Sequence, residues 1–246
     1  MNLLKKILVV LWKVWLVVLS SVLVLIIGVF WTFPLALSSK TFPLAYKGIR
    51  LWALLSFYGS GFRLESQGST QLNKDQTYLF IANHSSMIDI LILAILHPNH
   101  PLVFVGKEEL ARIPIFGKIY RQICITVDRK SARSKAHVFG SAKQKIGQGN
   151  SLVIFPEGGI ADDQTPVLHP FKDGAFTIGI ATQTPIAVYA LKGPKEMFPE
   201  AWTKGYPGKV IAELVEVIPT ENLSLADKNA LKNHCFDQLE TALMRQ

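Results

Sequence analysis

The pair of residues best suited to do chemistry in this chain is His84 and Asp89, five positions apart in segment 83–89. A neutral histidine held by a carboxylate can act as a general base, because the carboxylate stabilises the imidazolium that forms when the proton is taken. Residues five apart in one α-helix would not face each other, since each residue turns the helix by about 100°. We therefore expect His84 in a turn that leaves a strand and Asp89 in the helix that follows.

The same pair also has a structural explanation, in which the histidine caps a turn and the aspartate lies on a solvated first helical turn. Ser85 or Ser86 could cap this helix by accepting a hydrogen bond from an unpaired N–H. The positive end of the helix dipole would help to keep His84 neutral, as a base must be. The rest of the chain has to decide between the two explanations.

Apolar patterns predict the elements that would position this pair in a chain of 246 residues, which is long enough for one sizeable core. Strands are expected at residues 62–67, 78–82, 102–105, 123–127, 152–155, 186–191 and 210–218, and helices at 87–96, 115–119, 134–146, 175–182 and 225–244. The second to sixth strands are nearly continuous apolar runs, which is typical of strands covered on both faces. The sequence predicts an α/β fold with a mostly parallel mixed sheet flanked by helices, in which ligands bind beyond the carboxyl ends of the strands.

The N-terminal region contains an uncharged apolar stretch, residues 14–37, that is long enough to cross a hydrocarbon core of about 30 Å. A secretory signal peptide normally has an apolar region of only about 7–15 residues, so an uncleaved membrane anchor is favoured. Cations flank the stretch almost equally, which leaves its orientation open: Lys5, Lys6 and Lys13 on one side, and Lys40, Lys47 and Arg50 on the other. Residues 43–60 could lie in the membrane interface, form a second short membrane helix, or pack on the core.

The charge of the chain predicts acidic partners. The net charge is +8, and residues 101–150 hold ten of the Lys and Arg residues against three acidic ones. Mean hydropathy is +0.27. A surface that faces anionic lipid headgroups fits both the excess of cations and the apolar N-terminal stretch. No nucleic-acid-binding module is recognisable. The two cysteines, Cys124 and Cys235, lack metal-ligand spacing and are expected to be free thiols.

Two further turns follow predicted strands. Arg129 ends one of them, and a planar guanidinium suits phosphate, although a salt bridge to Asp128 or a surface position is the alternative. Lys130 is a weaker candidate for the same role. The other turn, residues 155–159, contains glycines that let the backbone approach a ligand, and Glu157 in it could orient a hydroxyl or pair with Arg129. A tight turn with an exposed glutamate is its structural alternative.

Together these segments resemble the ordered motifs of the glycerolipid acyltransferase family, over residues 40–220. The group they resemble most is bacterial 1-acyl-sn-glycerol-3-phosphate acyltransferase. The motifs are Asn83-His84-x4-Asp89, Val127-Asp128-Arg129, Phe155-Pro156-Glu157-Gly158, and Phe171-Lys172-x-Gly174-Ala175-Phe176 followed by Pro185-Ile186. The third motif of the family usually continues Thr-Arg, where this chain has Gly159-Ile160, so a possible phosphate contact is missing and the identity of the acceptor is left open.

The resemblance implies an enzyme that moves a fatty acyl group from acyl carrier protein or coenzyme A to the 2-hydroxyl of 1-acyl-sn-glycerol-3-phosphate, which gives phosphatidic acid. It implies His84 as base, Asp89 as its partner, and Arg129 with Lys130 as phosphate contacts. The acceptor site would be shaped by Phe155, Pro156, Glu157 and Gly158. Backbone N–H groups near Gly158 or Ser85 would stabilise the oxyanion.

The resemblance also implies a division of the chain and a location. Residues 1–60 would form N-terminal transmembrane or interfacial helices, and residues 61–246 the catalytic domain, on the cytoplasmic face of the inner membrane. No metal, other cofactor or nucleic acid is expected. The alternatives are another lyso-lipid acceptor, such as a lyso-ornithine lipid or a lysophospholipid, and a non-catalytic membrane adaptor that binds lipid.

Overall fold

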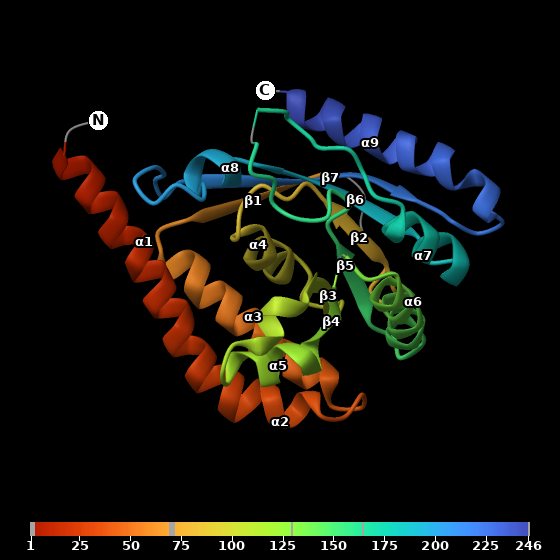
Figure 1. Ribbon diagram of the computed structural model, residues 1–246, viewed down its shortest axis with the longest axis horizontal. Helices are drawn as coiled ribbons and strands as arrows, with labels where there is room; N and C mark the ends of the chain where they lie inside the picture. The colour runs from red at the N-terminus through yellow and green to blue at the C-terminus, as the bar shows by residue number, and fades with distance from the viewer. Residues whose placement is uncertain (1–2, 69–71, 129, 164, 246) are drawn as a thin grey trace.

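The fold is built on a mixed sheet, shown in Figure 1 for a computed structural model that describes residues 3–68, 72–128, 130–163 and 165–245. Within those residues the sheet has seven strands in the order β1-β7-β6-β2-β5-β3-β4. They are β1 Arg63–Gln67, β2 Leu79–Ala82, β3 Leu102–Lys107, β4 Cys124–Val127, β5 Ser151–Ile154, β6 Ile186–Lys192 and β7 Lys209–Ile218. Strands β2 to β6 are mutually parallel, whereas β7 pairs antiparallel with β6 and carries β1 parallel to itself. The predicted α/β class and the mostly parallel sheet are confirmed.

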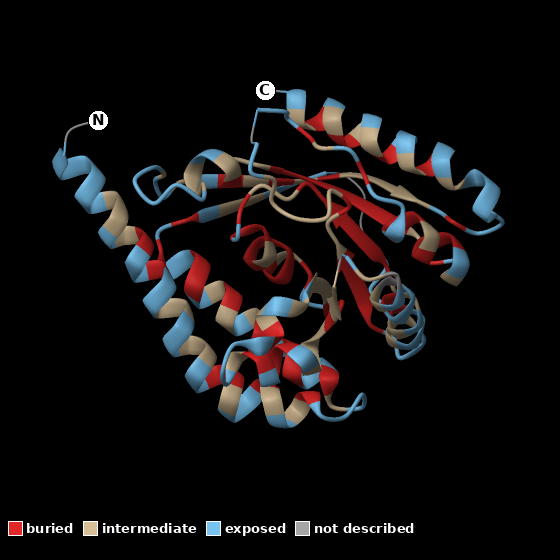
Figure 2. Cartoon of the chain, viewed as in Figure 1, coloured by how far each residue is buried: buried red, intermediate tan, exposed pale blue. Residues whose placement is uncertain are grey.

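Helices cover both faces of the sheet. One face packs on α3 (Phe42–Gly59) and α4 (Asp89–Leu96), and the other on α6 (Ala132–Gly147), α7 (Gly174–Thr182) and α9 (Lys228–Met244). Shorter helical segments complete the chain: Glu108–Arg112, α5 Phe116–Ile123, α8 Pro194–Met197 and Leu225–Asp227. All four residues of β2 are buried, because alternate side chains enter the two cores, as the buried strands in Figure 2 show.

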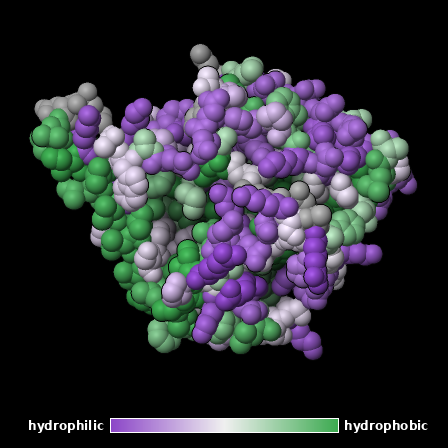
Figure 3. Space-filling model, viewed as in Figure 1, coloured by the Kyte–Doolittle hydropathy of each residue, from purple (hydrophilic) through white to green (hydrophobic). Residues whose placement is uncertain are grey.

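The N-terminal helix is longer than the predicted apolar stretch. α1 (Leu3–Leu23) continues through a π-helical segment, Val24–Thr32, into α2 (Phe33–Ala36), and the continuous helix of 34 residues is apolar and long enough to cross a membrane. Its outer side exposes large apolar side chains, which form the green band along α1 in Figure 3. This exposed apolar surface associates the chain with a membrane. The predicted division at residue 60 falls between α3 and β1 and stays a prediction.

Helix α3 turns back from α2 and packs on the core, which is one of the three positions that its sequence allowed. Phe57 and Tyr46 are buried in it, and the Tyr46 hydroxyl donates to the carbonyls of Ala94 and His97 at the end of α4. Leu55 lies on the opposite, exposed side. Helix α3 therefore joins the core on one side and extends the apolar outer surface on the other.

Two smaller sequence predictions also have clear outcomes. The helix after the 83–89 turn begins at Asp89 and not at residue 87, and the weak capping box of the last helix is present between Ser224 and Asp227. Cys124 and Cys235 are free, as predicted. Burial raises the pKa of each thiol to about 12, so both are protonated and unreactive at neutral pH.

The position of α3 predicts a difference between two substitutions on it. Phe57→Ala should lower the free energy of unfolding by about 3–5 kcal/mol, because it opens a cavity where Phe57 stacks on Phe62 at 5.1 Å. Leu55→Ala, on the exposed side, should change it by no more than about 0.5 kcal/mol. Denaturant titration of both variants in detergent measures the difference. Equal effects would show that α3 does not belong to the core.

Candidate active site

The candidate site lies where β2, the strand between β5 and β6, ends. Asn83 follows the strand directly and is buried. Its side-chain amide donates to the carbonyl of Leu191 at 3.0 Å, and its side-chain oxygen accepts the N–H of Leu191 at 2.8 Å. These two bonds continue the pairing of β2 with β6 by one residue, so the start of the 83–89 turn is fixed to the sheet.

His84 and Asp89 face each other across this turn, as the separation of strand and helix predicted. The distance from His84 Nδ1 to Asp89 Oδ2 is 3.0 Å, and the Asp89 side chain has no exposed surface, whereas that of His84 is 11% exposed. The backbone N–H groups of Ser85 and Ser86 donate to the same Oδ2 at 2.8 and 2.9 Å. Because a carboxylate only accepts, Nδ1 of a neutral His84 carries the proton, and Nε2 presents its lone pair outward.

Neither serine caps α4, although the sequence allowed it. Ile88 precedes α4 without a side-chain cap, and the Ser86 hydroxyl donates to the carbonyl of Phe198 instead. The backbone N–H groups of both serines donate to the carboxylate of Asp89 at the first helical position. The N–H of Gly158 is also occupied, since it donates to the carbonyl of Phe155 at 3.0 Å. These three N–H groups are thus bonded within the protein, and the position of the oxyanion donors stays a prediction.

The loop after β5 lies against His84. The ring of Phe155 stacks on the imidazole with centroids 3.9 Å apart and planes 14° apart. The carboxylate of Glu157 accepts the N–H of His84 at 2.6 Å through one oxygen and the N–H of His169 at 3.0 Å through the other. Burial raises the pKa of Glu157, and the two backbone N–H bonds oppose that shift. Glu157 thus joins the His84 turn to the 155–172 segment.

A cavity of about 320 Å³ opens beside Glu157 and is lined also by Gly158, His169 and Lys172. Gly158 has a φ of +86°, a backbone conformation that favours glycine, and the Lys172 side chain lies directly over it. The N–H of Lys172 donates to the carbonyl of Pro156 at 2.8 Å. The structure therefore brings Phe155, Pro156, Glu157 and Gly158 together with His84, and adds Lys172 to them.

The predicted phosphate contacts are less well defined. Arg129 lies outside the described residues. Lys130 is exposed, and its N–H donates to the Asp128 carboxylate at 2.9 Å. Lys107 ends β3 and pairs in register with Val127, so a further cation lies at the same edge of the sheet.

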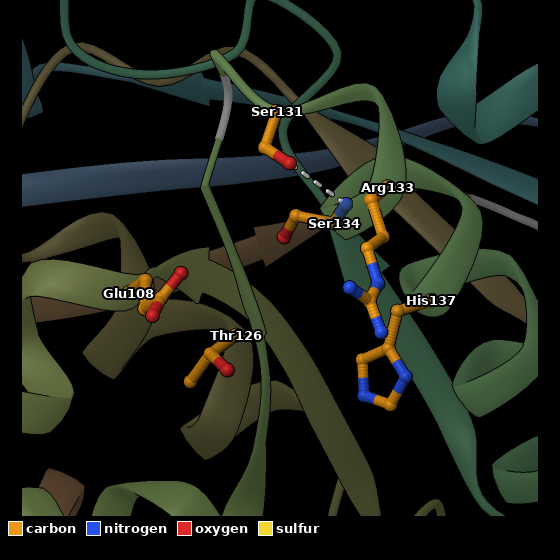
Figure 4. A pocket seen from close by; sticks show the side chains of 6 residues that line it. All are labelled: Glu108, Thr126, Ser131, Arg133, Ser134 and His137. Atoms are coloured by element: carbon orange, nitrogen blue, oxygen red, sulfur yellow. Dashed lines mark hydrogen bonds between the residues drawn. The ribbon is translucent and has the colours of Figure 1, made fainter.

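A second cavity, of about 340 Å³, is lined in part by Ser131 and Ser134, whose N–H donates to the Ser131 hydroxyl (Figure 4). Arg133 and His137 of α6 line one side of it, with Glu108 and Thr126 across from them. Among the described residues, no three His, Cys, Asp or Glu side chains are grouped closely enough to hold a metal ion.

Three contributors to the site had little or no signal in the sequence. His169 contributes a backbone N–H, which no residue pattern reveals, and Ser86 donates its hydroxyl to the carbonyl of Phe198, 112 positions away. Lys172 was visible as part of a motif but had no assigned role. For His169 and Ser86 the reason is the same, because bonds that involve backbone atoms of distant segments depend on the fold and not on residue type.

Comparison with known proteins identifies the family. A protein-family model described as Acyltransferase matches residues 63–192, which is more than half of the chain. A 1-acyl-sn-glycerol-3-phosphate acyltransferase of Helicobacter pylori is 29% identical over 64% of this chain and 65% of its own length. A chloroplastic 1-acyl-sn-glycerol-3-phosphate acyltransferase of Brassica napus is 30% identical over 61% of this chain and 43% of its own length. An uncharacterized acyltransferase of Schizosaccharomyces pombe is 26% identical over 74% of this chain and 66% of its own length. The chain spans less than two thirds of the length of these relatives.

The fold has a solved counterpart. The crystal structure of the 1-acyl-sn-glycerophosphate (LPA) acyltransferase from Thermotoga maritima matches with a TM-score of 0.79, at 21% identity, over 100% of this chain and 99% of that one. The matched region of the family model begins at β1 and ends with β6, so it contains the 83–89 turn, the loop after β5 and Lys172. The chain belongs to the acyltransferase family.

Proposed function

We propose that the chain transfers a fatty acyl group from a thioester to the 2-hydroxyl of 1-acyl-sn-glycerol-3-phosphate, giving phosphatidic acid. The observation that carries this proposal is the His84–Asp89 pair at the carboxyl end of β2, with Nδ1 of the imidazole engaged and the ring partly exposed. A base of this kind suits the removal of a proton from a hydroxyl. The H. pylori and B. napus relatives carry the name of this activity.

In the proposed reaction, Nε2 of His84 takes the proton of the acceptor hydroxyl while that oxygen attacks the thioester carbonyl carbon. The tetrahedral intermediate then expels the thiolate, which takes the proton back from Nε2 and leaves as a free thiol. Asp89 keeps the imidazole oriented through Nδ1–H and stabilises its cationic form between the two steps. No covalent acyl-enzyme is needed, which agrees with the inert Cys124.

The site also supports a phosphate-bearing acceptor. The Lys172 ammonium lies over Gly158 at the cavity beside Glu157, next to the position where the family usually carries the arginine that Ile160 replaces here. A lysine can meet the phosphate as a point charge. We propose Lys172 as the cation that compensates for the missing arginine, with Arg129 as the second cation.

The donor and the location belong to the same proposal. Acyl carrier protein and coenzyme A both present the acyl group as a thioester, so neither changes the chemistry at His84, and no further cofactor is required. We propose that the catalytic residues face the cytoplasm, where these donors occur. The apolar chains of both substrates would lie along the exposed surface of α1 and α3.

The proposal predicts that His84→Ala lowers kcat by about 10²–10⁴-fold, because the base is lost. Asp89→Asn should also lower kcat strongly, since a neutral amide cannot stabilise the imidazolium and accepts the three donors at Oδ2 less strongly than a carboxylate does. Transfer of a labelled acyl group to lysophosphatidate in vesicles measures both. His234→Ala, which removes an exposed histidine paired with Glu216, is the matched control. Near-normal turnover of a folded, vesicle-bound His84→Ala protein would refute the assignment.

Because Glu157 is buried, the difference in stability between the native protein and Glu157→Gln should depend on pH. Its pKa is raised by burial above 4.5 in the folded protein, so the folded state binds this proton more tightly than the unfolded chain does. The native protein should therefore lose stability relative to Glu157→Gln as pH rises from 4.5 through the folded pKa, and regain it as pH falls.

Denaturant titrations of the native protein and of Glu157→Gln, from about pH 4 to about pH 8, test this expectation. A difference that is constant, or that changes with pH in the opposite direction, would contradict it. The variant should also lose about tenfold in kcat, because one amide oxygen cannot hold both the His84 and the His169 N–H groups.

The acceptor is tested with Lys172. Lys172→Met should raise the KM for lysophosphatidate by about tenfold or more, through loss of a charged contact, and leave kcat nearly unchanged. It should not affect the KM for an acceptor without a phosphate monoester, such as a lyso-ornithine lipid. Lys74→Met, which removes an exposed cation before β2, is the control. If the native protein prefers the phosphate-free acceptor, lysophosphatidate is not its acceptor, and the alternative lyso-lipid acceptor is supported.

A further inference from the structure

Lys13 is buried in the middle of the apolar helix α1, where only 2% of the residue's surface is exposed. The ion pairs found among the described residues do not include it. Its ammonium instead donates to the carbonyls of Pro199 and Ala201, the latter at 2.8 Å, and lies 4.7 Å from the centre of the Phe198 ring. Burying a cation without an acidic partner is costly, so such a lysine needs an explanation beyond general stability.

The partners of Lys13 all belong to residues 198–206, a loop between α8 and β7 that lies beside α1 in Figure 1. Gly205 in this loop has a φ of +119°, and a Cβ atom there would lie 2.5 Å from the carbonyl of Met197 and 3.4 Å from Lys13. The ring of Phe198 also packs on Trp12, one position before Lys13, with centroids 5.7 Å apart. The 198–206 loop is therefore shaped to hold α1 at this lysine.

The same loop also contacts the 83–89 turn. The carbonyl of Phe198 accepts the hydroxyl of Ser86 at 2.7 Å, and Ser86 is 1% exposed. The N–H of Ser86 in turn donates to the carboxylate oxygen of Asp89 that holds His84. Phe198 thus contacts the anchoring helix through its ring and the catalytic turn through its carbonyl.

We propose that Lys13 is a positioning residue for the catalytic turn, which acts through the 198–206 loop and the Ser86 hydroxyl. The contacts form one continuous path, from the Lys13 ammonium to Phe198, Ser86, Asp89 and finally His84. Docking of α1 fixes the Phe198 carbonyl, and that carbonyl fixes one of the two N–H groups that orient Asp89. The helix that associates the chain with a membrane therefore also sets the geometry of the base.

This inference rests on the proposed function for its kinetic readout, but it also makes a local structural prediction. If Lys13 only stabilised the docking of α1, its loss would weaken folding or vesicle binding and leave the 83–89 turn unchanged in the protein that remains folded. If Lys13 positions the turn, its loss loosens Ser85 and Ser86. Their amide hydrogens, which are bonded to Asp89, would then exchange faster.

The experiment compares Lys13→Met, Lys13→Arg, Ser86→Ala and the double variant Lys13→Met/Ser86→Ala in the full-length protein on phosphatidylethanolamine–phosphatidylglycerol vesicles. Lys6→Met, which removes an exposed cation two helical turns earlier, is the matched control. Amide exchange of residues 84–89 and the kcat and KM of acyl transfer to lysophosphatidate are measured for each. Lys13→Arg keeps a cation that can donate to both carbonyls and should restore most of the loss.

We expect Lys13→Met to speed exchange in the turn and to lower kcat by about tenfold, with the KM within about twofold of the native value, and Lys6→Met to do neither. The double variant should be no more than about twofold worse than the worse single variant, because both changes break one path. Losses that multiply, or an unchanged turn and kcat in Lys13→Met, would overturn the proposal.

Two results separate the positioning role of Lys13 from a folding defect and from failure of the proposed function. If Lys13→Met does not fold, Ser86→Ala tests the same path without touching α1, and an unchanged kcat and exchange rate in Ser86→Ala would overturn it. If the native protein transfers no acyl group to lysophosphatidate, the proposed function fails. Faster exchange of residues 84–89 in Lys13→Met would then still support the positioning role.

Discussion

One buried carboxylate oxygen organises the site. Oδ2 of Asp89 accepts from Nδ1 of His84 and from the N–H groups of Ser85 and Ser86, while the side chain has no contact with solvent. Charge-assisted bonds in such surroundings are strong, and removing the acceptor would leave three donors unpaired. The turn cannot keep its shape without this oxygen, so the position of the base, and with it the proposed chemistry, depends on it.

The sheet supplies the frame for that interaction. β2 lies between β5 and β6, and the turn that follows it is tied to both neighbours: Asn83 bonds to Leu191 on the β6 side, and Glu157 after β5 accepts the N–H of His84. A third tie joins Ser86 to Phe198 of the 198–206 loop, which in turn contacts the N-terminal helix. Three elements that are distant in sequence therefore converge on one turn, which holds the imidazole in a single orientation before any substrate binds.

Much of this arrangement could be predicted from the sequence. Continuous apolar runs gave the parallel strands, and the spacing of His84 and Asp89 already required a turn followed by a helix. The bonds of the turn could not be predicted, because Ser85 and Ser86 act through N–H groups that compete for one carboxylate, whereas residue type suggested a side-chain cap. Lys13 was one flanking cation among several, since its carbonyl partners lie 186 and 188 positions away. Arg129 remains a prediction from its motif.

The tautomer of His84 decides whether this residue can act as the base. Nitrogen-15 NMR of the histidine-labelled protein at a pH where His84 is neutral, with the signal assigned by its loss in His84→Ala, reports which ring nitrogen carries the proton. We expect the proton on Nδ1, bonded to Asp89, and a free lone pair on Nε2. A proton on Nε2 would contradict it, because His84 could then not take a proton from an acceptor hydroxyl on its exposed side.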